Sequence, residues 1–184
     1  MEVVFRRTGA RRYAVIVICA EGPSRMLDPA PGYDDDLPHD LVHYLVEAEL
    51  GLTCGVYGAA ARGGGSFIAA FDQGVTTRER ARQQRKQQKR ERALRAHDAR
   101  RAAEMAKSER LAAVCDVVWR RKHGQRPDPD RRSPALEAED VAEVERVVAQ
   151  LDAIAPLWRE LVVDGELVFE WPAVRPRRDA GRRR

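Results

Sequence analysis

The segment 34-DDDLPHDLVHYLVEAELG-51 carries the most complete set of local structural signals in this chain. Its acidic run leads into Pro38, and carboxylates there meet the unpaired N–H groups and positive dipole end of a helix. Gly51 is the residue best able to adopt the left-handed conformation that ends a helix. The segment therefore predicts a helix over residues 38–50, around which the rest of the fold is expected to pack.

Two apolar runs before this helix predict a β-hairpin. Residues 3–5 and 13–19 are rich in β-branched and aromatic side chains, and Thr8-Gly9-Ala10 between them supplies the connection. A weaker third strand is expected over residues 25–27, before prolines and a glycine end it.

Glycines punctuate the chain after the helix, and we expect residues 51–66 to be mostly loop, followed by a short apolar piece over 67–71. The cluster follows a helix and lacks a Gly-Lys-Ser/Thr sequence, so a flexible loop is favoured over a nucleotide site. Near the end of the chain, residues 167–169 predict a last strand, and the arginine-rich residues 173–184 predict a disordered tail.

Residues 77–122 contain no Pro or Gly and consist largely of strong helix formers. Gly124 ends the stretch, which would form a rod of roughly 70 Å if it were uninterrupted. Only the part beyond Met105 offers apolar side chains for packing. The first half is therefore expected to be a solvated, basic helical arm.

A further helix is predicted after Ser133-Pro134, where Glu137 gives a start that resembles a capping box. Pro156 should kink or restart this helix. Its apolar positions follow 3–4 spacing, which is typical of an antiparallel or coiled-coil partner: Val141, Val144, Val148, Leu151, Ala155, Trp158 and Val162.

These elements predict an α+β fold in which a small antiparallel sheet packs on the 38–50 helix. The sheet combines the N-terminal hairpin with the C-terminal strand, and a long helical hairpin projects from it. Leu111 and Val118 are expected to contact the face formed by residues 144–151. The expected organisation is 1–72 for the β-hairpin, helix and Gly-rich loop, 73–163 for the helical hairpin, 164–172 for the final strand, and 173–184 for the tail.

Charge is distributed in blocks along the chain. The net charge of +4 combines −4 over residues 1–72, +10 over 73–123, −7 over 124–170 and +5 over 171–184. Such blocks are typical of a nucleic-acid partner, or of two segments that neutralise each other. Arginine supplies nearly all of the basic residues, a bias that a GC-rich genome produces without selection for phosphate binding.

The three cysteines Cys19, Cys54 and Cys115 are widely spaced and form no CxxC pair. This pattern argues against a disulfide framework and a cysteine zinc site, and favours a reducing compartment. The apolar stretch Tyr13 to Ala20 is too short to span a bilayer and lacks a signal-peptide cleavage site. We expect a cytoplasmic protein with no membrane association.

The pattern His39-Asp40-Leu-Val-His43 resembles the zincin H-E-x-x-H motif, because histidines at i and i+4 on a helix can chelate one metal ion such as zinc. Asp40 replaces the catalytic Glu and is one methylene shorter. Glu47 is two turns away and cannot join His39 on one ion. No downstream ligand stands out, since His97 and His123 lie in the basic segment. Histidines at the border of an apolar face are the alternative interpretation.

The helical wheel assigns the other polar residues of this segment. Asp40 and Glu47 are expected to point to water, beside an apolar face that contains Leu41 and Leu45. Glu49 falls inside that face, where it needs an arginine partner or a raised pKa unless the last turn frays, which is the outcome we favour.

A stripe of basic residues recurs at 3–4 spacing along the arm and is suited to follow a phosphate backbone: Arg78, Arg82, Arg85, Lys89 and Arg92. No aromatic residue interrupts it, so base stacking is not expected. A solvated helix remains the alternative.

The segment DDDLPHDLVHYLVEAELGL resembles uncharacterised small proteins encoded by GC-rich bacteria, over residues 1–72 and the final strand. The resemblance implies no activity. Two hypotheses follow from the residues. The preferred one is a non-enzymatic binding protein whose arm, residues 78–95, engages nucleic acid or an acidic protein. The other is a metal-dependent hydrolase centred on His39, Asp40 and His43.

Overall fold

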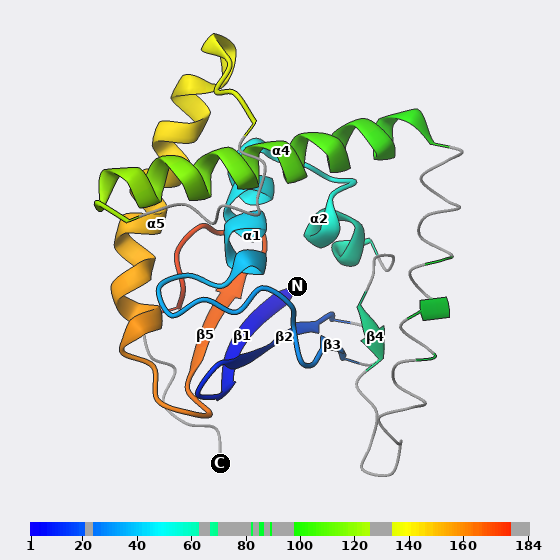
Figure 1. Ribbon diagram of the computed structural model, residues 1–184. Helices are drawn as coiled ribbons and strands as arrows, with labels where there is room; N and C mark the ends of the chain where they lie inside the picture. Colours follow the sequence, from blue (N-terminus) through cyan, green and yellow to red (C-terminus); the bar gives the residue numbers. More distant parts are fainter. Residues whose placement is uncertain are drawn as a thin grey trace.

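A computed structural model of the protein shows an antiparallel sheet with helices packed against it (Figure 1). It describes residues 1–20, 24–62, 67–69, 82, 85, 86, 89, 98–125 and 134–177. The α+β class predicted from the sequence is confirmed.

The sheet brings the two ends of the chain together, because β1 pairs with both β2 and the C-terminal β5. Phe5 of β1 lies opposite Val15 on one side and Leu167 on the other. The predicted hairpin, third strand and last strand are all present. In the sheet order β4-β3-β2-β1-β5, the strands are Ile68–Ala69, Arg25–Leu27, Arg12–Ile18, Glu2–Gly9 and Glu166–Glu170.

Helix α1, His39–Leu50, begins after Pro38 and ends at Gly51, whose φ of 62° is the left-handed cap expected there. Its central residues are buried on every side. They pack into one core with the sheet and with helices α4 and α5. A helix enclosed in this way has no water-facing side along its middle turns, so the exposed position expected for Glu47 is wrong.

Helix α2, Val56–Ala61, lies within the stretch that we expected to be mostly loop. Its short apolar sequence carries no cap that a single-sequence argument recognises. The backbone N–H groups of Val56, Tyr57 and Gly58 bond instead to the side chain of Glu47. Gly55 is required here, because a Cβ at that position would collide with the Glu47 carboxylate.

Helix α4, Ala99–Lys122, begins after its N-cap Asp98, so residues 77–122 do not form one uninterrupted helix. Asp98 has an extended backbone (φ −129°, ψ 98°), and its side chain accepts a hydrogen bond from the Arg101 N–H. An N-cap aspartate gives a helix a new start. Before it, most of residues 77–97 lie outside the described part of the chain.

Helix α5, Val141–Arg159, starts later than predicted, after a short 3-10 turn, η1, Ala138–Asp140. Glu137 makes no side-chain cap, and Pro156 lies inside α5, which continues past it. The apolar face is also wider than expected and shifted. Val147 and Ile154 are buried, whereas the outer positions Val141 and Val162 are exposed.

Helices α4 and α5 run in the same direction where they touch. Arg110 bonds to Asp140 near the start of α5, and Lys122 bonds to Asp152 further along. An antiparallel hairpin would reverse this order. The expected projecting hairpin is therefore replaced by two helices that pack on each other and on α1 (Figure 1).

Residues 173–177, which we expected to begin a disordered tail, lie against the sheet. The Arg177 N–H donates to the Val168 carbonyl, and its guanidinium pairs with Glu2. The Ala173 carbonyl accepts from the Tyr44 hydroxyl. Residues 178–184 lie outside the described residues. Within the part of the chain that the structure describes, no helix has the length and apolarity needed to cross a membrane.

Candidate metal centre

The first turns of α1 place His39 and His43 side by side. Their Nε2 atoms are 3.1 Å apart, and their rings meet edge to face at a centroid distance of 4.6 Å. Two ligands bound tetrahedrally to one zinc ion, each about 2.0–2.1 Å from it, are separated by roughly 3.3 Å. The i and i+4 spacing thus brings the two Nε2 atoms to nearly the separation of two ligands on one zinc ion.

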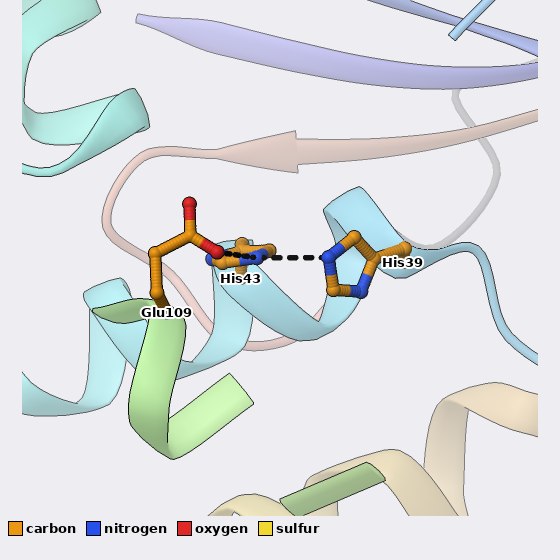
Figure 2. Close-up of side chains that lie close together, drawn as sticks. All are labelled: His39, His43 and Glu109. Carbon is orange, nitrogen blue, oxygen red and sulfur yellow. Dashed lines mark hydrogen bonds and ion pairs between the residues drawn. The ribbon is translucent and has the colours of Figure 1, made fainter. Parts of the chain in front are cut away.

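Glu109 of α4 completes the cluster (Figure 2). Its Oε2 atom lies 3.6 Å from His43 Nε2, and one donor atom from each of the three residues lies within 4.8 Å of the others. The His43 side chain is almost fully buried, whereas that of Glu109 is 62% exposed. The cluster therefore lies at the edge of the α1–α4 contact, with one side open to solvent.

The other ring nitrogen of His43 begins a buried polar relay, which consists of His43, Ser108 and Glu47. His43 Nδ1 is 3.0 Å from Ser108 Oγ, and this hydroxyl donates to Glu47 Oε1 at 2.9 Å. Ser108 and Glu47 are both fully buried. Metal-bound histidines commonly have such a partner on their second nitrogen, because it fixes the ring orientation.

Glu47 ends the relay at the start of α2. Its two oxygens accept the N–H groups of Val56 at 2.8 Å, Tyr57 at 2.8 Å and Gly58 at 3.4 Å. Burial raises the pKa of the Glu47 carboxyl, and the N–H groups together with the Ser108 hydroxyl act against that rise. Hydrogen bonds thus stabilise a carboxylate that the apolar surroundings disfavour.

Asp40, between the two histidines in sequence, is occupied elsewhere. Its carboxyl bonds to the hydroxyl of Tyr13 in strand β2. Burial raises the pKa of Asp40 to about 6, a shift to which the charge of Glu109 adds and which the Tyr13 hydrogen bond opposes. The expectation that Asp40 points to water is wrong, and the position of the general base in H-E-x-x-H serves here to join α1 to the sheet.

The donor set of the cluster suits a borderline metal ion. Two imidazole nitrogens and one carboxylate form a set found in zinc sites, where a fourth position is left for water or another ligand. The same set binds non-haem Fe(II) in other proteins. Ca²⁺ and Mg²⁺ prefer oxygen ligands throughout and fit less well.

Two residues of the site, Glu109 and Ser108, were not among the site residues predicted from the sequence. Glu109 was missed because nothing local connects it to His43, 66 positions earlier. Ser108 carried a usable signal, since it is the one polar residue in an otherwise apolar series at 3–4 spacing: Met105, Ser108, Leu111, Cys115 and Trp119, all of them buried.

The other candidate residues lie away from the metal cluster or outside the residues that the structure describes. Glu49 pairs with Arg146 and Gln150 of α5, so the arginine partner is present and fraying is wrong. Arg82, Arg85 and Lys89 are exposed helical positions. Arg78 and Arg92 lie outside the described residues, and the continuous basic stripe remains a prediction.

Comparisons of the chain with protein-family models, with curated proteins and with solved structures gave no match. The resemblance drawn from the 34–52 segment is thus a prediction still, and function is argued from the site alone.

Proposed function

We propose that this protein binds one divalent transition-metal ion through His39, His43 and Glu109, with zinc as the best fit to the donors. The observation that carries the proposal is the approach of three donor atoms from two helices to within 4.8 Å of one another. A carboxylate beside two imidazoles provides the negative charge that a divalent cation requires. One of the sequence arguments against a metal site was the missing third ligand, and Glu109 is our candidate for that ligand.

Metal binding is favoured over metal-dependent hydrolysis. Hydrolysis by an H-E-x-x-H type centre uses a carboxylate next to the first histidine as general base. In this protein that residue is Asp40, whose carboxyl is hydrogen-bonded to Tyr13. The proposed role of the centre is therefore to hold an ion that links α1 to α4, with no hydrolytic step.

The test is zinc titration by calorimetry on chelator-treated protein purified without a histidine tag. Wild type should bind close to one equivalent. His39→Ala, His43→Ala and Glu109→Gln should each lose more affinity than the 10–100-fold typical of an outer residue of a metal site. The matched controls are His123→Ala and Glu145→Gln, which change exposed residues of the same types. Wild type without zinc binding, or controls that lose as much, would overturn the proposal.

A second proposal concerns the basic arm, residues 78–95, which carries a net charge of +7. We propose that it engages nucleic acid, with an acidic protein as the competing partner. The exposure of Arg82, Arg85 and Lys89 supports this proposal. So does the pairing of Asp140 in η1 and Asp152 in α5 with α4 residues beyond Asp98, which leaves these acids engaged outside the arm.

A salt titration on one labelled DNA duplex tests the arm. Four to six phosphate contacts give a log–log slope of roughly −4 to −5. Arg82→Gln, Arg85→Gln and Lys89→Gln together should flatten it by about three. The control removes three exposed arginines elsewhere, Arg11, Arg12 and Arg121, and should leave most of the slope in place. Absence of binding at low salt would remove nucleic acid as the partner.

A further inference from the structure

The Glu47 carboxylate receives more donors than any other side chain in the relay. Oε1 accepts from the Val56 N–H and from Ser108, and Oε2 accepts from the N–H groups of Tyr57 and Gly58. A carboxylate offers about four lone-pair positions. All of them are filled by donors, so Glu47 has no position left from which to give a proton to Ser108.

The filled lone pairs of Glu47 determine which atom donates in the hydrogen bond between Ser108 and His43. A serine hydroxyl has one proton, and Ser108 gives it to Glu47. Its oxygen can then only accept from His43 Nδ1, 3.0 Å away. His43 therefore carries a proton on Nδ1. Since Ser108 and Glu47 are fully buried, exchange of partners with water does not compete with this arrangement.

We infer that Ser108 and Glu47 are positioning residues that hold His43 as the Nδ1–H tautomer and thereby present its Nε2 lone pair to the metal. The ligand part of this inference rests on the proposed function, whereas the tautomer is a property of the metal-free protein. The lone pair faces His39 Nε2 at 3.1 Å and Glu109 Oε2 at 3.6 Å. In the metal-free protein His39 donates its Nε2 proton to His43, and on metal binding this proton moves to His39 Nδ1.

The Nδ1–H tautomer of His43 also gives a functional reason for the buried relay, which packing alone does not provide. His39 Nε2, His43 Nε2 and a Glu109 carboxylate oxygen converge between α1 and α4, and their approach is favourable only with a proton or a cation between them. Because the relay keeps the proton of neutral His43 on Nδ1, His43 Nε2 is left as an acceptor, and a cation is a species that contacts all three donor atoms at once. A histidine free to change tautomer would bind zinc more weakly by the cost of that change.

The experiment is a long-range ¹H–¹⁵N NMR spectrum of metal-free protein labelled at histidine, at about pH 7.5, with His43 assigned through His43→Ala. Wild type should show His43 protonated at Nδ1 and bare at Nε2. A proton on Nε2, or on both nitrogens, would overturn the inference whether or not zinc binds. This measurement needs no variant of Ser108 or Glu47 to fold.

The second arm compares zinc affinity in Ser108→Ala, which removes the acceptor, with Ser108→Thr, which keeps the hydroxyl. Ser108→Ala should lose about 10–100-fold and shift His43 towards the Nε2–H tautomer, and Ser108→Thr should retain the wild-type tautomer. Unchanged zinc affinity in a folded Ser108→Ala protein would overturn the positioning role. If wild type binds no zinc, the proposed function fails, and the spectrum alone decides the tautomer.

Discussion

Helix α4 makes two contacts that place their polar groups in opposite ways. Against α1, its polar residues are central and buried, as in Ser108 with His43 and Glu47. Against α5, the Lys122–Asp152 pair lies at the rim, with side chains 55% and 29% exposed, and the buried acid at this contact, Asp140, lies just before the first residue of α5. The difference shows that α4 is held to α5 mainly by apolar packing, while its contact with α1 maintains a costly polar network. Such a cost is what a functional site typically requires.

The largest effect that separates these contacts is expected for Glu47→Ala. This change leaves three backbone N–H groups and the Ser108 hydroxyl without their acceptor, and opens a cavity beside Gly55. The expected loss is about 3–5 kcal/mol in the free energy of unfolding. Denaturant unfolding of metal-free protein measures it.

The matched change at the rim is Lys122→Ala with Asp152→Ala. An exposed ion pair contributes about 0–1 kcal/mol, so this double variant should remain close to wild type. Equal losses in the two experiments would contradict the contrast between a buried network and a solvated rim.

A smaller, pH-dependent effect is expected for Asp40→Asn, at a second, partly buried carboxyl of α1. The pKa of Asp40 is raised from 3.8 to about 6, so the folded protein holds a proton that the unfolded chain releases. Wild-type stability should thus fall, relative to Asp40→Asn, as pH rises through about 4 to 6, and stay lower above that range. The shift corresponds to about 3 kcal/mol at most.

Unfolding curves of both metal-free proteins at pH 3.5, 5 and 7 test this expectation. Stability profiles that remain parallel across that range would show that Asp40 titrates alike in the folded and unfolded states.

Local signals in the sequence were sufficient for α1, the β1–β2 hairpin, β3 and β5, whereas β4 was expected only as a short apolar piece. Pro38 and Gly51 mark the ends of α1, and two apolar runs on either side of a glycine-containing connection mark the hairpin. Helical spacing was also sufficient to find the His39–His43 pair, since residues i and i+4 share one face of a helix.

The remaining features depend on contacts between distant segments. Helix α2 starts where the Glu47 side chain accepts its first N–H groups, which no capping residue in its own sequence reveals. The common direction of α4 and α5 is set by tertiary packing, because helical spacing alone is the same for parallel and antiparallel partners. Glu109 reaches His43 only through the crossing of α4 over α1 (Figure 1).

X-ray absorption at the zinc edge of the zinc-loaded protein tests the central claim most directly. The account predicts nitrogen and oxygen ligands at about 2.0–2.2 Å, outer-shell scattering from two imidazoles, and loss of one imidazole in His43→Ala. Sulfur scattering at about 2.3 Å, or a first shell without imidazole, would place the ion elsewhere and contradict the assignment of His39, His43 and Glu109 as a metal centre.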